Sequence, residues 1–355
     1  MAITPGFDPT EAETFIAMCS NLEGTPPPPL QQPPIPGNWT LMYDSQSIGP
    51  FDNRWQLWQD TSGTGNYAVV IRGTVDQTGS IIEDLLAVMV PATGSISVDG
   101  ITLGYQFAAD PLAALHVGFA LGTLITLYDP TAGILAHLIT QVPSGAGVFV
   151  VGHSQGAAMA TLCRSFLNYT SLLSDLDLQY SFKTYAFAQP KPGNDHYGDD
   201  YEAIAGNAGT AFTVNNNQDW VPQVPFTFEL YRDINVPNVL SVLGSKPTPG
   251  VAAVHEAVTR YHHEQTSKAL ARQKPVIERL GRVVRDSRLV KPSAAAGTTT
   301  DITIVPTLNF VGCGSAITLQ GTPGDNPDDP ADGWWQHHAA LYYLLLQKQF
   351  PAAAR

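Results

Sequence analysis

The chain has 355 residues, of which 44% are hydrophobic and only 14% are charged. This length and balance allow one large globular domain with a sizeable core and exclude a mostly disordered chain. The net charge of −13 argues against general nucleic-acid binding, so we expect no nucleic-acid partner.

Residues 1–38 are predicted to form a proline-rich N-terminal arm. A weak apolar periodicity in residues 1–24 indicates one short helix, and the seven prolines of residues 26–36 predict an extended strap. The first residues show no basic segment followed by an apolar one, and no apolar run reaches the length of a membrane span. We therefore expect no transmembrane segment, and either a cytoplasmic protein or a secreted one whose signal has been removed.

Residues 39–230 are predicted to form the core of an α/β fold. Apolar and often β-branched segments indicate buried strands, and a glycine-rich turn indicates a hairpin. Because strands alternate with segments of helical periodicity, we expect a mostly parallel sheet flanked by helices. The expected strands are 39–44, 55–58, 67–71, 148–151, 182–188 and 211–214, and the expected helices are 81–89, 116–139 and the segment that follows residue 154.

Residues 231–300 are predicted to be a basic helical insertion. Within it, residues 255–291 contain nine of the chain's 18 lysines and arginines against four acidic residues. An apolar stripe at helical spacing predicts packing against the protein, with the basic face in water. A basic amphipathic helix of this kind can instead lie on an anionic lipid interface. The stripe consists of Val276, Ile277, Leu280, Val283 and Val284.

The strongest chemical signal lies in residues 148–166. A buried strand leads into Gly152-His153-Ser154-Gln155-Gly156, and small residues at helical spacing follow. Strand, sharp turn and close-packed helix are typical of a nucleophile elbow, which would expose the hydroxyl of Ser154. The backbone N–H of Gln155 would then supply one oxyanion-hole donor, and Thr74, after an earlier strand, is the candidate for the other. The non-catalytic interpretation is a tight turn with a solvated serine.

A serine nucleophile needs a base and a carboxylate that orients the base. In this arrangement the carboxylate follows the serine along the chain and precedes the histidine. Asp219 is preferred because it follows the strand 211–214 and precedes a rigid Val-Pro pair; otherwise it caps an Asx turn. The other candidates are Asp195, Asp199, Asp200 and Asp233.

Residues 301–355 are predicted to complete the core and to carry the catalytic histidine. They contain an expected strand pair at 309–319, a loop rich in Asp, Pro and Gly, and a closing helix at 334–350. His337 and His338 lie where the loop meets the helix, which is the place expected for a loop-borne base. We prefer His338, with His337 as the alternative base. The other downstream histidines lie in the insertion: His255, His262 and His263.

These residues together resemble the class 3, or fungal-type, lipases. Five segments carry the resemblance in the order of the family: 70–74, 116–119, 152–156, 187–194 and 216–225. In family terms they are the strand ending in Arg-Gly-Thr, the His-X-Gly-Phe helix start, the Gly-His-Ser-X-Gly elbow, the Pro-Lys-X-Gly-Asn turn and the segment of the triad aspartate. The resemblance implies an α/β-hydrolase, a triad of Ser154, Asp219 and the downstream histidine, and an oxyanion donor at Thr74; the helical insertion is predicted from the sequence pattern alone.

Three features depart from the family pattern. Gln155 replaces the usual Leu after the nucleophile. Residues 75–115 are longer than the family's lid segment and lack its usual Trp, so the expected helix at 81–89 is either a lid or an ordinary packed helix. The insertion at 231–300 has no counterpart in the family pattern.

The resemblance implies a serine carboxylic-ester hydrolase, closest to a lipase that acts on acylglycerols or similar apolar esters through an acyl-enzyme. Its partner would be a lipid or ester substrate, with a lipid–water interface as one place of action. Such chemistry requires no cofactor, and three widely spaced cysteines indicate no metal site. The alternatives are a non-catalytic binding module of the same fold and an esterase for feruloyl or polymeric esters.

Overall fold

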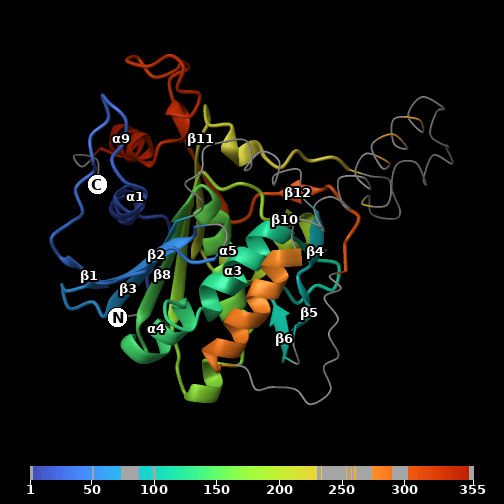
Figure 1. Cartoon of the computed structure of the whole chain (residues 1–355). Helices are drawn as coiled ribbons and strands as arrows, with labels where there is room; N and C mark the ends of the chain where they lie inside the picture. The colour runs from blue at the N-terminus through green and yellow to red at the C-terminus, as the bar shows by residue number, and fades with distance from the viewer. Residues whose placement is uncertain are drawn as a thin grey trace.

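A computed structural model of the chain describes residues 3–49, 52–72, 88–98, 101–229, 274–289 and 303–351, with single residues at 233, 253, 257 and 260. At its centre is a seven-stranded sheet in the order β1-β2-β3-β8-β9-β11-β13 (Figure 1). The first three strands are antiparallel neighbours, and β3 through β13 run parallel. The strands are β1 (Trp39–Asp44), β2 (Arg54–Asp60), β3 (Asn66–Arg72), β8 (Gly147–His153), β9 (Ser181–Phe187), β11 (Ala211–Asn216) and β13 (Ser315–Leu319).

Both faces of the inner parallel strands of this sheet are buried, which explains why these strands read as continuous apolar runs. All of β8 is buried. Its Val148 and Val150 belong to one hydrophobic core, whereas Phe149 and Val151 belong to the other. The expected mostly parallel sheet of an α/β-hydrolase is therefore confirmed, and β8 is its central, doubly covered strand.

Helices cover the two faces of the sheet. On one face, α5 (Gln155–Tyr169) packs on β8 and β9, and α3 (Val117–Tyr128) packs on α5. On the other face, α1 (Pro9–Glu23) and α9 (Ala339–Gln349) lie side by side (Figure 1). No helix in the described ranges is both long and apolar enough to cross a bilayer. The shorter helical elements are α4 (Ile134–Gln141), η1 (Ser174–Leu176), α6 (Asp195–Tyr201), η2 (Glu202–Gly206), η3 (Val221–Gln223) and η4 (Trp335–His337).

The expected helix at 116–139 is broken in two, as α3 and α4. Pro130 has no N–H to donate and disfavours a helical conformation at the residue before it. Asp129 accordingly leaves the helical region, and its carboxylate accepts hydrogen bonds from the next turn, at the N–H groups of Thr131 and Ala132. The apolar periodicity correctly predicted helix on both sides of the break, but Pro130 determines where α3 ends.

Two smaller sheets correct two further expectations. The expected strand pair at 309–319 is wrong as a pair, because its halves join different sheets after a turn at Gly314, whose φ is 93°. Of the expected helix at 81–89, residues 81–87 lie outside the described residues, and Met89 begins a strand. The four-stranded sheet is β12 (Phe310–Val311), β10 (Gly193–Asn194), β7 (Ala114–His116) and β4 (Met89–Pro91), and the two-stranded one is β5 (Thr93–Val98) with β6 (Ile101–Gln106).

The described part of the predicted insertion includes a helix at 274–287, drawn in orange in Figure 1. All five residues of its apolar stripe are buried in the same core that contains α3 and α5. The alternative that this stripe lies on a lipid interface is therefore wrong, since the protein itself covers it. The rest of residues 231–300 lies outside the described residues, apart from four single positions, and the limits of the insertion stay a prediction.

The short helix expected within residues 1–24 is confirmed as α1, which belongs to the core. Asp8 caps α1 by accepting hydrogen bonds from the N–H groups of Thr10 and Glu11, and Pro9 opens the helix. Glu11 then pairs at 2.6 Å with the buried Lys183 of β9. α1 is thereby fixed on the sheet, and its apolar residues fill the core beneath α9.

We predict that Phe15→Ala lowers the free energy of unfolding by about 3–5 kcal/mol, as the loss of a buried phenylalanine does elsewhere. The ring of Phe15 is buried against Trp39, Phe149 and Tyr185. Urea unfolding followed by circular dichroism measures the effect. The control is Leu344→Ala on α9, which removes a side chain that is 47% exposed. Equal, small effects of the two substitutions would mean that α1 is not part of the cooperative core.

Candidate active site

Ser154 lies at the sharp turn between β8 and α5. Its backbone has φ 58° and ψ −135°, a conformation that costs free energy for any residue other than glycine. Its N–H donates to the carbonyl of Phe187 on the neighbouring strand, at 3.0 Å. Gly152 is required because a Cβ there would collide with the backbone of Gly156. The spacing Gly-X-Ser-X-Gly is thus the steric condition for the turn, as the elbow prediction expects.

The hydroxyl of Ser154 contacts His337. The Nε2 atom of His337 lies 2.8 Å from Ser154 Oγ, and its Nδ1 lies 2.7 Å from Asp219 Oδ2. With its proton on Nδ1, the neutral ring donates to the carboxylate and accepts from the serine hydroxyl. This orientation is that of a base ready to receive the serine proton.

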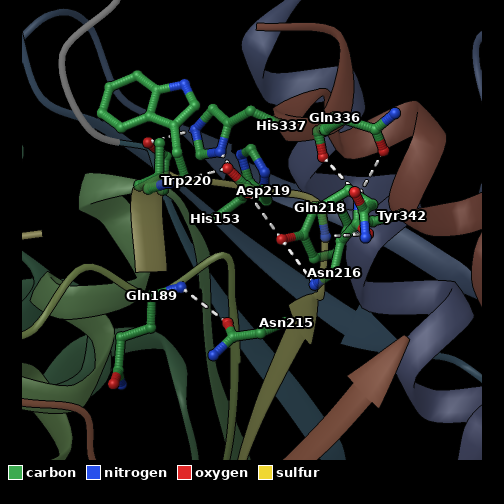
Figure 2. Close-up of polar contacts among 12 residues, drawn as sticks. His153, Gln189, Asn215, Asn216, Gln218, Asp219, Trp220, Gln336, His337 and Tyr342 are labelled. Carbon is green, nitrogen blue, oxygen red and sulfur yellow. Dashed lines mark hydrogen bonds and ion pairs between the residues drawn. The ribbon is translucent and has the colours of Figure 1, made fainter. Parts of the chain in front are cut away.

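Asp219 is 2% exposed and held by three donors. One oxygen accepts from His337 and from the Tyr342 hydroxyl at 2.7 Å (Figure 2), and the other accepts from the N–H of Val221 at 2.9 Å. Burial alone would raise the pKa of Asp219, but His337 and the other donors outweigh it and lower that pKa below its ordinary value. The carboxylate therefore stays ionised behind the imidazole.

Preferring His338 over His337 as the base was wrong. His338 instead pairs with Asp332, with Nε2 3.0 Å from Oδ2. The physical reason is local: η4 ends at His337, and His338 takes up an extended conformation, with φ −63° and ψ 131°, before α9 begins. The change of backbone direction sends the two adjacent imidazoles to different partners. The expected single helix at 334–350 is interrupted at this point.

The oxyanion-hole candidates differ in how far the structure describes them. Gln155 is the first residue of α5, so its backbone N–H lies at the positive end of the helix dipole, beside the nucleophile. Thr74 lies outside the described residues, so its assignment stays a prediction. Arg72, which ends β3 two residues earlier, holds its side chain on Asp52 at 3.3 Å.

The remaining candidates do not reach Ser154 in the described contacts. Asp195 begins α6, and Asp200 accepts from the Tyr169 hydroxyl at 2.6 Å. No described contact joins Asp199 or Asp233 to the serine. The three histidines at 255, 262 and 263 lie outside the described residues.

Two residues beside the triad candidates were given no role from the sequence. Tyr342 supports Asp219, and its signal in the sequence is a tyrosine a few residues after the candidate histidines. Glu23, from the end of α1, reaches the residue before the nucleophile and had no signal in the sequence. A cleft of about 760 Å³ reaches Ser154 and His337, and the N-terminal segment around Glu23 forms part of its wall. Among the described residues, no cluster of three or more His, Cys, Asp or Glu could hold a metal ion.

The sequence and the structure of this chain are similar to those of known lipases. Residues 68–229 match the sequence profile of the family described as lipase (class 3). Among curated proteins, none matches the chain. The similar solved structures include a mono- and diacylglycerol lipase from Aspergillus oryzae (17% identity, 62% of this chain and 76% of that one, TM-score 0.43), lipase II from Rhizopus niveus (17%, 61% and 75%, 0.43) and a lipase from Rhizopus microsporus var. chinensis (17%, 63% and 73%, 0.40).

We predict that Tyr342→Phe raises the pKa of Asp219 and lowers the free energy of unfolding at pH 7 by about 1–3 kcal/mol. The buried Tyr342 hydroxyl donates to Asp219 and accepts from the N–H of Asn216 at 3.0 Å, so both groups lose a partner. Because the folded pKa of Asp219 lies below the unfolded one, its stabilising effect is complete above about pH 4 and is lost as the pH falls through the folded pKa. In the variant that loss still begins near the unfolded pKa, but it ends at a higher pH and is smaller in total.

Denaturant unfolding between pH 2 and pH 7 measures both effects. The matched control is Tyr343→Phe, since the Tyr343 hydroxyl accepts from Gln347 in an exposed contact within α9. If the two variants lose the same small free energy and keep the same pH dependence, Tyr342 does not support the carboxylate.

Proposed function

Because residues 68–229 match the profile of the class 3 lipases, we propose that this lipase-like chain is a serine carboxylic-ester hydrolase. Its proposed substrates are acylglycerols or other esters with apolar acyl groups. The observation that carries the proposal is the position of His337, within hydrogen-bond distance of both Ser154 Oγ and Asp219 Oδ2. Three groups in this order suit acyl transfer through a covalent intermediate.

Acylation begins when Ser154 Oγ attacks the ester carbonyl carbon. A C–O bond forms, the serine proton moves to His337 Nε2, and the carbonyl electrons move to oxygen. The N–H of Gln155 stabilises that oxyanion, and Thr74 is the proposed second donor. Asp219 stabilises the imidazolium without taking its proton. When the tetrahedral intermediate collapses, the ester C–O bond breaks and His337 protonates the departing alcohol.

Deacylation repeats these steps with water as the nucleophile. His337 Nε2 accepts a proton from the water as its oxygen attacks the acyl-enzyme. Collapse releases the carboxylic acid and returns the proton to Ser154 Oγ. Every proton that moves is held at one ring nitrogen, so the reaction depends on the orientation of His337 more than on any other single contact.

Substrate would reach the serine through the cleft at its hydroxyl. One side of this cleft is formed by His338 and Asp332 near the C-terminus, and the opposite side by residues 24–28 near the N-terminus. The two sides touch where the side-chain amide of Asn326 donates to the carbonyl of Pro28, at 3.2 Å. We propose that the lipid–water interface delivers apolar esters to this cleft.

We predict that Ser154→Ala abolishes hydrolysis of p-nitrophenyl butyrate, because no other group takes the nucleophile's place. His337→Asn should lower kcat/KM by roughly 10³–10⁴-fold, as loss of a general base does. His338→Asn is the matched control and should change kcat/KM by less than about 10-fold, since His338 contacts Asp332 and not the serine. Initial rates at pH 7.5 for the wild type and the three variants measure this.

Equal losses in the two histidine variants would contradict the assignment of the base. Turnover retained in Ser154→Ala would remove the serine mechanism altogether. The same assay with esters of increasing acyl-chain length tests the substrate class. A preference for short soluble esters, without a gain when the substrate forms an interface, would replace the lipase proposal by an esterase.

A further inference from the structure

His153, the residue directly before the nucleophile, is bound by a carboxylate from the far N-terminal helix. Its Nδ1 lies 2.6 Å from Oε1 of Glu23, the last residue of α1. The side chain of His153 is 3% exposed, and its Nε2 is buried without a hydrogen-bond partner among the described residues. An apolar side chain would occupy this position at a lower free-energy cost, because a buried polar ring needs hydrogen bonds or a paired charge to replace its lost hydration.

The position of Glu23 is itself unfavourable unless a cation faces it. A carboxylate in the last turn of a helix lies at the negative end of the dipole, whereas a cation there is stabilised. Burial would lower the pKa of His153, but Glu23 outweighs burial and raises that pKa above the ordinary value. Burial would likewise raise the pKa of Glu23, and His153 outweighs it and lowers that pKa. The 2.6 Å contact and these two opposite directions both favour an ion pair between the two groups.

This ion pair lies against the base. The ring centroids of His153 and His337 are 4.7 Å apart with a tilt of 36°, and Figure 2 shows the two rings one behind the other. Glu23 binds Nδ1 at the edge of the His153 ring, and the His337 ring contacts the same imidazole. Two positively charged rings at this distance repel each other.

The other titratable and charged groups around the pair come from several elements and are fixed by contacts of their own. Arg72 of β3 lies beside His153 in the sheet register and binds Asp52. They also include Asp219 after β11, Tyr342 of α9, His338 before α9 and Cys19 of α1. None of them replaces Glu23 as the direct partner of His153 Nδ1.

We propose that Glu23 and His153 are positioning residues for the reaction: their ion pair orients His337 and sets the pH at which its ring can accept the serine proton. This inference rests on the proposed function, since it assigns His337 the role of base. By holding a positive charge beside His337, the pair disfavours a second charge on that ring.

The test is the pH profile of kcat/KM for the variant Glu23→Gln with p-nitrophenyl butyrate. The glutamine keeps the shape and can still accept a hydrogen bond from His153, but without a carboxylate the buried ring becomes neutral. We expect the acid limb of the profile to move to higher pH by roughly one unit. Glu23→Asp, which keeps the charge, should shift it less.

The matched control is Glu11→Gln on the same helix. It also removes the carboxylate of a 2.6 Å ion pair with a buried cation, but twelve residues earlier, about 18 Å along α1. It should cost stability and leave the acid limb in place. An unmoved limb in Glu23→Gln, or an equal shift in Glu11→Gln, would overturn the proposal. In a His153→Asn background, Glu23→Gln should no longer move the limb upward.

An NMR titration of the imidazole nitrogens in the inactive Ser154→Ala protein separates this inference from the proposed function. Introducing Glu23→Gln into that protein should make His153 lose its proton at a lower pH and His337 lose its proton at a higher pH. This result without any ester hydrolysis by the wild type would sink the proposed function and leave the coupling intact. Hydrolysis by the wild type with unchanged ring titrations would sink the coupling alone.

Discussion

The hydrogen bond between His337 and Asp219 is the contact on which the geometry of the site depends. It joins residues 118 positions apart, and the same ring reaches Ser154, which lies 183 positions earlier in the chain. Contacts between residues that are close in sequence cannot by themselves hold the His337 ring in this position. Its place is decided by how α9 packs on the sheet, because Tyr342 of that helix contacts both Asp219 and the backbone of Asn216 at the end of β11. The helix, the aspartate and the imidazole are therefore held as one unit.

The site is completed by segments on both sides of the part of the chain that matches the family. Residues 68–229 contain Ser154 and Asp219, whereas His337 and Tyr342 come from beyond them and Glu23 from before them. α1 and α9 lie side by side on the same face of the sheet, which brings the two ends of the chain to one edge of the active site (Figure 1). The packing of α1 against α9 therefore contributes both to the core of the protein and to the completion of the site.

The sequence predicted those parts of the structure that depend on short-range physics. Buried parallel strands are recognisable because both of their faces are apolar, and the elbow is recognisable because its glycines are a steric necessity around Ser154. The candidate carboxylate Asp219 followed from its place after a strand. The break between α3 and α4 was also within reach, since Pro130 is visible in the sequence.

The choice between His337 and His338 was beyond sequence reasoning. It depends on where η4 ends, and a helical pattern cannot locate an end to within one residue. The partnership of Glu23 with His153 was also hidden, because α1 is buried on more than one side and shows only weak periodicity. The first feature depends on the exact residue at which a short helix ends, and the second on packing between segments that are far apart in sequence.

The most direct test of the central claim is covalent labelling with diethyl p-nitrophenyl phosphate, followed by mass spectrometry of the peptides. An activated serine displaces p-nitrophenolate and becomes phosphorylated, whereas an idle serine does not react at an appreciable rate. We expect one adduct, on Ser154, formed about 100-fold more slowly or not at all in His337→Gln. An adduct on another residue, no adduct, or equal labelling without His337 would contradict a triad of Ser154, His337 and Asp219.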